Sequence, residues 1–329
     1  YSPHFSAYNR NKESIQLDLQ SESGQDKLHR LLSRADVLLD NYRPGVLSRL
    51  RLDDETLERL NPRLVRCSIT GFGDSGPYRD RPAYDSVGIA MSGLASLLLD
   101  PDEPDAAGPT IADNVTGMYA CYGVLGALVS RAKTGKGARV STNMLESTIA
   151  FIPDAFATFT RLGIVSAPHT RVATSQSYAF VCADGRMVAL HLSTPDKFWK
   201  GLLTVIERTD LAGDERFSTR DARVTHYDAL KAELASAFRT QPRAEWCRRL
   251  DEHDVPHAPI WSVDEVVDDP QVRHLRTFYE MQHPTLGRVI GIQRAVLIDG
   301  ERGPNRMAAP TLGEHTVTIA EEFDLDCLD

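Results

Sequence analysis

The sequence predicts an α/β protein in two parts, of which the larger is a parallel sheet covered by helices and the smaller is α+β. Strand and helix patterns alternate through the first 165 residues, an order typical of a parallel sheet. Between residues 175 and 283 a strand pair comes first and helices follow. A length of 329 residues suits two domains. We therefore expect a large domain at 1–165, a small α+β domain at 175–283, and a segment at 284–329 that returns to the large domain.

The first predicted elements belong to the parallel sheet. Residues 15–19 alternate apolar and polar side chains, which is the period of a half-buried strand. Ser21 or Ser23 can cap the helix that follows, and a second strand is expected in ADVLLDNY. A short helix is expected at residues 46–60, and LVRCSITGFG predicts a further strand that runs into a glycine-bearing turn.

Helices dominate the next segment. We expect one helix near residues 84–99 and a connection in PDEPDAAGP. From Asn114 to about Lys133 apolar residues occur nearly all round the helical pattern, which predicts a buried helix. The strand RVSTNM and a helix from about Glu146 to Leu162 complete the large domain.

The small domain is expected to start with a hairpin. The strands SYAFVCADG and RMVALHL are joined by Ala183-Asp184-Gly185, which is a hairpin signal. Helices follow at about 195–207, 227–239 and 243–253. VPHAPIWSVDEVVDDPQV is typical of a boundary, and VIGIQRAVLI resembles a returning strand.

Composition and charge exclude several classes of protein. Hydrophobic residues make up 42% of the chain and charged residues 25%, which allows a sizeable core and argues against disorder. The net charge of −9 opposes a broad surface for nucleic acid or anionic lipid, so neither partner is expected. The apolar runs are far shorter than the ~20 residues of a membrane span. Five scattered cysteines without a C-x-x-C pair suit a reducing compartment, and we expect a cytoplasmic protein.

Short motifs taken singly do not reveal the chemistry. The sequence contains no Walker A lysine loop, no H-E-x-x-H and no G-x-S-x-G pattern. The glycine string GFGDSG at residues 71–76 is, on its own, more typical of a turn. The ten histidines lack metal-ligand spacing, and His315 in LGEHT is interpreted as a helix-start residue.

Six longer blocks occur in an order and approximate spacing that resemble a known family: NRNKESIQLDL, ADVLLDNYRPGVLSRL, NPRLVRCSITGFGDSGPYRDRPAYD, GPTIADNVTGMYACYGVLGALVSRAKTGKG, VPHAPIWSVDEVVDDPQV and TLGEHT. They resemble the class III coenzyme A transferases, which include the formyl-CoA, carnitine and bile-acid CoA-transferases. The resemblance spans nearly the whole chain and is dense over residues 9–150. It implies a Rossmann-like large domain, an interlocked homodimer, and an enzyme that moves CoA from an acyl-CoA to a free carboxylic acid.

The same resemblance implies that Asp113, in TIADNVTGM, is the catalytic residue. In such a reaction the carboxylate attacks the acyl-CoA thioester to form an aspartyl-acyl anhydride, and CoA then returns to form an aspartyl-CoA thioester. Backbone N–H groups are the expected donors to the oxyanions. Without the resemblance, an aspartate just before a helix is more often an N-cap; both roles can coexist, because a helix N-terminus stabilises an anion.

Coenzyme A is expected as the substrate and acyl carrier, with no metal and no redox cofactor. By family position, Lys12 would meet a phosphate as a point charge, Arg49 as a bidentate donor, and Tyr42 would lie against adenine. Taken singly, each is more often a solvated charge or a packed ring. Asn41 is assigned to CoA binding by family position as well, and Arg43, Ile69 and Gly71 join the set as neighbours on the same strand ends, where ligands of open α/β sheets usually bind.

Tyr84 bears on the choice of reaction within the family. The related α-methylacyl-CoA racemases carry a His-Asp pair where this chain has Tyr84-Asp85. A phenol with a pKa of about 10 is a poor base at neutral pH, which favours transfer over racemisation. Tyr84 is then a residue of the acyl pocket or, alternatively, a packed core tyrosine. A racemase and a non-catalytic CoA-binding subunit stay as alternative functions.

The chain departs from the family pattern in two places. Some members carry a glycine-rich loop over the active site in the second domain, and residues 165–200 contain no such string. Members usually have a strand-helix-strand unit before the NRNK motif, whereas eight residues precede that motif here. Either a leading unit of a longer parent precedes this sequence, or the protein departs from the fold at its first strand.

Overall fold

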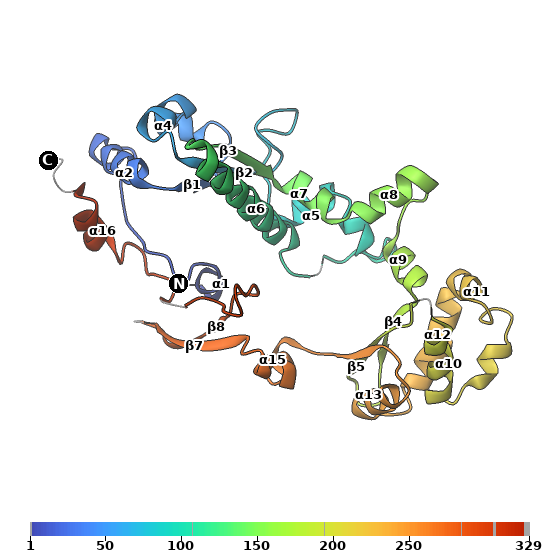
Figure 1. Cartoon of the computed structure of the whole chain (residues 1–329). Coiled ribbons are helices and arrows are strands. Elements are labelled where there is room, and N and C mark those ends of the chain that lie inside the picture. The colour runs from blue at the N-terminus through green and yellow to red at the C-terminus, as the bar shows by residue number, and fades with distance from the viewer. Residues whose placement is uncertain (1, 107, 194, 284, 305–306, 326–329) are drawn as a thin grey trace. The chain divides into compact units, whose positions relative to one another are not determined.

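The computed structural model describes residues 2–106, 108–193, 195–283, 285–304 and 307–325, and the chain divides into two compact units (Figure 1). The first unit contains Tyr1–Ala95, Ala106–Asp154 and Gln271–Asp329. The second contains Ser96–Asp105 and Ala155–Pro270. The domain limits expected from the sequence stay predictions.

The first unit is built on a three-stranded parallel sheet, as the sequence predicted. Its strands are β1 (Val37–Asp40), β2 (Val65–Thr70) and β3 (Arg139–Asn143), in that order, with Val37 opposite Val65 and Arg66 opposite Arg139. Helix α2 (Glu22–Arg34) precedes β1, and helices α3 (Val46–Arg49) and α4 (Asp54–Leu60) lie between β1 and β2 in the chain. Ser21 caps α2 by accepting the N–H of Gly24, which confirms one of the two predicted caps.

The core of this unit lies between the sheet and the helices that cover it. Leu32, Leu52, Leu57 and Leu64 are buried together, and Leu38 of β1 packs against them. The helix α6 (Ile111–Thr134) packs on the sheet so closely that a Cβ at Gly123 would lie 2.6 Å from the Val140 side chain. Glycine is therefore needed where α6 crosses β3.

The strand expected at residues 15–19 is wrong. Residues 12–18 have no regular secondary structure. The segment forms hydrogen bonds with the start of α16 (Thr316–Glu322) and not with a neighbouring strand. The N–H of Ser14 donates to Nδ1 of His315, and the N–H of His315 donates to the Ser14 carbonyl. Ile15 packs with Ile319 and Ala320, so contact with a helix produces the alternation that a strand would have explained.

The long helix α6 is confirmed, but its predicted burial on all sides is wrong. Its buried face carries Ala112, Val115, Thr116, Ala120 and Ala127. The opposite face leaves apolar side chains open to solvent, with exposed fractions of 72% for Met118, 77% for Tyr122 and 62% for Val129. The helix therefore has two apolar faces, and in the described parts of the chain only the first of them is buried.

Two predicted helices are shorter than expected. The helix near residues 84–99 ends early as α5 (Asp85–Met91), and a short 3₁₀ turn, Ala95–Leu97, follows. The helix expected from Glu146 to Leu162 is two helices, α7 (Met144–Phe151) and α8 (Pro153–Leu162). The break falls before Pro153, because proline has no N–H to donate and favours the first position of a new helix.

The second unit holds an antiparallel sheet, β4 (Ser177–Val181), β5 (Met187–His191) and β6 (His257–Ile260), in that order. The predicted hairpin is confirmed by the pairing of Ser177 with His191. The boundary-like stretch VPHAPIWSVDEVVDDPQV begins with β6, which pairs with β5 at the edge of the sheet, where Pro259 is tolerated. The second unit ends further along the same stretch, at Pro270. The helices around this sheet are α9 (Pro168–Ser175), α10 (Asp196–Val205), the 3₁₀ turn Thr209–Gly213, α11 (Arg220–Thr225), α12 (Tyr227–Phe238), α13 (Arg243–Glu252) and α14 (Val263–Val266).

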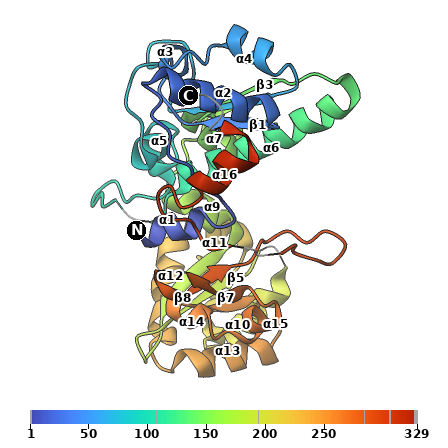
Figure 2. The same ribbon diagram turned by 90° about the vertical axis from the view of Figure 1, so that its left-hand side faces the viewer.

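Four elements remain. Helix α1 (Pro3–Tyr8) precedes α2 in the chain, and α15 (Pro270–His274), β7 (Phe278–His283) and β8 (Gly287–Ile292) follow α14. Of the expected returning strand VIGIQRAVLI, only the first four residues form a strand, as part of β8, and they pair with β7 in an antiparallel hairpin and do not join the parallel sheet. α16 does return, since it packs beside α2 through Ile319, Leu31 and Phe323 (Figure 2). No helix within the described residues is long and apolar enough to cross a membrane.

Candidate active site

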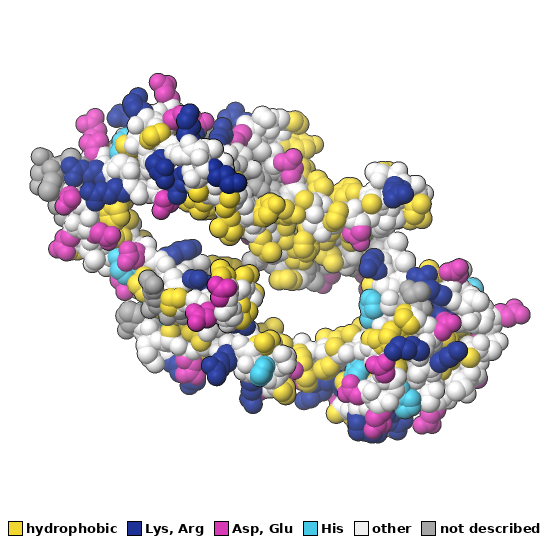
Figure 3. Space-filling view, viewed as in Figure 1, with side chains coloured by type: hydrophobic (Ala, Val, Ile, Leu, Met, Phe, Trp, Pro, Cys, Tyr) yellow, Lys and Arg dark blue, Asp and Glu magenta, His cyan; other side chains and the backbone are white. Residues whose placement is uncertain are grey.

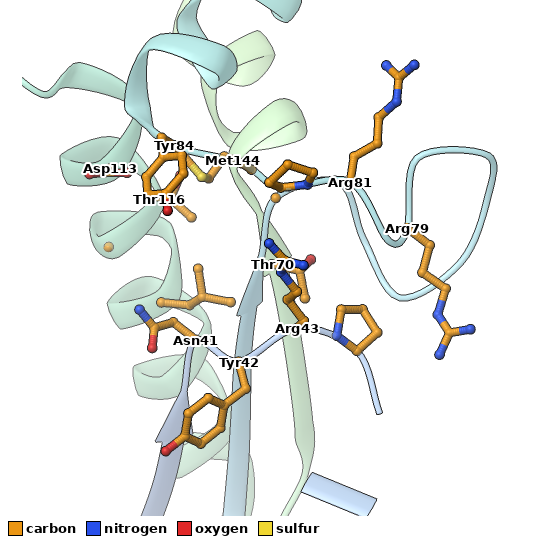
Figure 4. A pocket seen from close by; sticks show the side chains of 16 residues that line it. Asn41, Tyr42, Arg43, Thr70, Arg79, Arg81, Tyr84, Asp113, Thr116 and Met144 are labelled. Carbon is orange, nitrogen blue, oxygen red and sulfur yellow. The ribbon is translucent and has the colours of Figure 1, made fainter. Parts of the chain in front are cut away.

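A cavity of about 540 Å³ opens in the first unit at the carboxyl ends of the parallel strands. Ligands of open α/β sheets usually bind at this edge. The ends of β1 and β2, the loop before α5, and the first turns of α6 and α7 surround it (Figure 4). Seven of the residues singled out in the sequence line it together: Asn41, Tyr42, Arg43, Ile69, Gly71, Tyr84 and Asp113.

A turn at the end of β1 directs three of these residues to the cavity. Asp40, the last residue of β1, accepts the N–H of Tyr42 on Oδ1 (3.1 Å) and the hydroxyl of Ser68 on Oδ2 (2.7 Å). A carboxylate that binds its own chain two residues on stabilises such a turn. Asn41, Tyr42 and Arg43 therefore leave the sheet at a defined position.

A second turn, after β2, requires glycine. A Cβ at Gly71 would lie 2.2 Å from the Cβ of Ala83, because the returning loop passes directly against the strand end. The Thr70 hydroxyl accepts the N–H of Gly73 at 2.9 Å and stabilises the start of this loop. Because the loop passes this close to the strand end, Tyr84 lines the cavity. The first glycine of the GFGDSG string is therefore needed for this close contact.

Asp113 is the third residue of α6, not its N-cap. Thr110 occupies the cap position, so the cap interpretation of Asp113 is wrong. The Asp113 backbone N–H donates to Oδ1 of Asp85 at 3.1 Å. Burial raises the pKa of the Asp113 carboxyl, and the charge of Asp85 raises that pKa further. The N-terminus of α6 acts in the opposite direction and favours the ionised carboxylate.

Tyr84 stands at the N-cap position of α5 with 75% of its side chain exposed. The interpretation as a packed core tyrosine is therefore wrong. Figure 4 places Tyr84 and Met144 on the same side of the cavity as Asp113. A substrate group bound beside the Asp113 carboxylate would contact these two side chains.

Two predicted CoA residues do not line the cavity. Lys12 follows α1, where its Nζ donates to the Tyr8 carbonyl (3.1 Å) and to Oδ1 of Asn9 (2.8 Å). Arg49 ends α3, and its Nη1 lies 3.7 Å from where a Cβ of Gly45 would stand. Nη2 of Arg79 lies 4.0 Å from that same point, so Arg49 neighbours a residue of the cavity wall. Their roles in CoA binding stay predictions.

The sequence reasoning missed two cations of the cavity wall, Arg79 and Arg81. Both come from the loop before Tyr84, opposite Asp113 in Figure 4. The Arg81 guanidinium lies 4.3 Å from the centre of the Tyr78 ring. Across the described parts of the chain, no carboxylate forms an ion pair with either arginine or with Arg43. The two arginines of SGPYRDRPAYD, two residues apart and just before Tyr84, were the available signal.

Seven further residues of the cavity wall also escaped the sequence reasoning, and none of them carries a charge that a motif would reveal: Pro44, Thr70, Pro82, Ala83, Thr116, Gly117 and Met144. Among the residues that the structure describes, no group of three or more His, Cys, Asp or Glu side chains is arranged to hold a metal ion. The polar side chains that line the cavity thus carry one carboxylate, three guanidinium groups, the amide of Asn41, and hydroxyls.

Comparison with known proteins points to one family. Residues 1–316 match the family model described as CoA-transferase family III. The acetyl-CoA:oxalate CoA-transferase of Acetobacter aceti is 34% identical over 98% of this chain and 82% of its own length. The succinyl-CoA:glutarate CoA-transferase of Homo sapiens is 30% identical over 98% and 74%. A CAIB/BAIF family protein from Brucella suis has a similar structure, with a TM-score of 0.87, 30% identity, and coverage of 98% and 84%.

Proposed function

We propose that this chain, which belongs to CoA-transferase family III, transfers CoA through a covalent intermediate on Asp113. The family match and the relatives confirm the predicted class, an acyl-CoA:carboxylate CoA-transferase. The observation that supports the Asp113 step is the position of its carboxylate in the cavity at the strand ends, opposite unpaired guanidinium groups.

The proposed reaction has four steps. An oxygen of the Asp113 carboxylate attacks the thioester carbonyl, the C–S bond breaks, and CoA thiolate leaves an aspartyl-acyl anhydride. The thiolate then attacks the Asp113 carbonyl of the anhydride, which releases the donor carboxylate and forms an aspartyl-CoA thioester. The acceptor carboxylate expels the thiolate and forms a second anhydride. In the last step the thiolate attacks the acceptor carbonyl, so the new acyl-CoA leaves and the Asp113 carboxylate is restored.

We place CoA along the arginines of the cavity. Its phosphates would meet Arg43, and a guanidinium can bind phosphate through two parallel N–H bonds. Tyr42 is 48% exposed beside Arg43 and has a ring free to stack on adenine. Arg79 adds a further cation beside Arg49. This arrangement supports those expected CoA-binding residues that lie at the ends of β1 and β2. In the proposed reaction CoA is a substrate.

We propose a short dicarboxylate as the acceptor acid. The relatives from Acetobacter aceti and Homo sapiens are named for oxalate and glutarate. A dicarboxylate keeps one charged group while the other is activated, and the cavity offers unpaired guanidinium groups to that charge. A panel of mono- and dicarboxylates of equal length, assayed with one acyl-CoA, tests this choice. Equal kcat/KM for both classes would contradict it.

We propose a homodimer, interlocked as the resemblance implies, in the cytoplasm. The exposed face of α6 carries Met118, Tyr122, Leu125 and Val129, and α8 carries Phe159 and Leu162 exposed as well (Figure 3). Exposed apolar faces of this kind mark protein interfaces. Sedimentation of the protein and of a Tyr122→Asp variant tests the assembly: the variant is expected to shift toward monomer, and a wild-type monomer at micromolar concentration would refute the proposal.

Intact-mass spectrometry separates the proposed function from its alternatives. A transferase incubated with acyl-CoA gains mass on Asp113, and hydroxylamine converts that residue to a hydroxamate. A racemase would exchange the α-proton of a 2-methylacyl-CoA with solvent deuterium and need no acceptor acid. A non-catalytic subunit would bind CoA without any covalent change. Absence of mass on Asp113 during turnover would refute the proposed mechanism.

A further inference from the structure

We infer that Asp85 is a positioning residue for the transfer step: its carboxylate holds the main chain of Asp113 by accepting that residue's N–H. The two residues are 28 positions apart, and the N–H to Oδ1 distance is 3.1 Å. The inference rests on the proposed role of Asp113 and extends it to a residue that does not line the cavity.

The hydrogen bond meets a need of the helix. The first N–H groups of an α-helix have no carbonyl partner inside the helix. In α6 the cap residue Thr110 does not supply one, since its hydroxyl accepts the Asn114 side chain instead. Asp85, the first residue of α5, therefore caps α6 from a different helix. An ionised acceptor makes such a bond stronger than a neutral one would.

Close packing keeps Asp85 at this distance. A Cβ at Gly88, one turn beyond Asp85, would lie 3.0 Å from the Cβ of Ala112 and 3.3 Å from Cε of Met144. Ala112 is fully buried and directly precedes Asp113. The start of α5 is thus seated on the first turn of α6 and on α7, and the Asp113 backbone has little freedom to move.

Two consequences follow for the chemistry. The N–H of Asp113 is occupied, so the donors to the oxyanion of the tetrahedral intermediates are other groups. The charge of Asp85 also raises the pKa of the Asp113 carboxyl, second to burial. The other charged or titratable groups around the cavity are Tyr42, Arg43, Arg79, Arg81 and Tyr84. Among the residues that the structure describes, Asp85 is the carboxylate whose charge raises the pKa of Asp113.

Two substitutions at Asp85 separate its acceptor role from its charge. Asp85→Ala removes both, and we expect kcat to fall about 100-fold with KM for acyl-CoA nearly unchanged, since misplacing a reacting group costs roughly that much. Asp85→Asn keeps an oxygen acceptor, so kcat is expected within about threefold of wild type at neutral pH. Because the asparagine is uncharged, the pKa of Asp113 falls and the acidic limb of kcat moves to lower pH.

The readouts are kcat against pH and the rate of mass gain on Asp113, with Asp26→Asn on the exposed face of α2 as the matched control for loss of one charge. Wild-type kcat in Asp85→Ala would overturn the inference. If Asp85→Ala does not fold, an unmoved acidic limb in Asp85→Asn overturns it. The proposed function fails separately, if Asp113→Asn still gains mass from acyl-CoA.

Discussion

The sheet core of the second unit and helix α6 of the first unit differ in how completely they bury their apolar side chains. In the second unit Tyr178, Phe180, Phe238 and Trp246 contact one another in a row, with ring centroids 4.7–5.8 Å apart, and each residue is 3% exposed or less. In the first unit α6 leaves Tyr122 77% exposed. The sheet of the second unit and the helices packed on it thus form a self-sufficient core, whereas the first unit carries the cavity and a face of α6 whose apolar side chains are exposed.

Among these predictions, Asp113→Asn should have the largest effect, and it should lower activity without lowering folding stability. Removing the nucleophile should lower kcat at least on the order of 10⁴-fold. CoA affinity by calorimetry and the thermal midpoint should change little, because the Asp113 side chain is open to the cavity. If the variant instead loses folding stability to an extent that explains the lost activity, Asp113 supports the fold and the prediction is wrong.

Phe238→Ala should produce the opposite result, a loss of stability. Phe238 is 0% exposed between Phe180 and Trp246, and its truncation should lower the free energy of unfolding by about 3–5 kcal/mol. Val263→Ala on the same unit is the control, since Val263 is 89% exposed and should cost less than about 0.5 kcal/mol. Denaturant titration measures both, and equal values would contradict the self-sufficient core.

Arg43→Ala should act on substrate binding in the first unit. Loss of one charged hydrogen bond to a phosphate should raise KM for acyl-CoA about tenfold, with a smaller change in kcat. Arg59→Ala on the exposed side of α4 is the matched control and should leave KM unchanged. Steady-state kinetics decides, and an unchanged KM in Arg43→Ala would remove this residue from the CoA site.

The smallest effect concerns the pH dependence of stability in the second unit. Arg243, with a side chain only 4% exposed, donates to Glu265 at 2.7 Å and lowers the pKa of Glu265 from 4.5 to about 2. The ion pair therefore stabilises the fold above pH 4.5 and is lost as the pH falls toward 2.

Glu265→Gln should remove part of that pH dependence. The thermal midpoint of the variant should fall less steeply between pH 4.5 and 2 than that of wild type. Exposed Glu215→Gln serves as the control and should keep the wild-type slope. If both variants follow the wild-type curve, the ion pair between Arg243 and Glu265 does not contribute to the stability of this unit.

Much of the fold was predictable because its signals are local. Ser21 caps α2, Gly185 lies in the turn between β4 and β5, and His315 stands at the start of α16, each within a few residues of the element that it marks. The false strand at residues 15–19 shows the limit of such signals. Alternating burial against α16 and alternating burial in a sheet leave the same pattern in the sequence.

Motif blocks and short-range periodicity were enough to predict the family, the parallel order of strands and helices, and the candidate nucleophile Asp113. Three further facts emerged from the folded chain: Asp85 caps the helix of Asp113, Arg79 and Arg81 face the same cavity as Asp113, and one side of α6 is left open. These facts depend on helices and loops that meet across long stretches of chain. Their packing follows from shape and close contact, such as that at Gly88, and has no local signature.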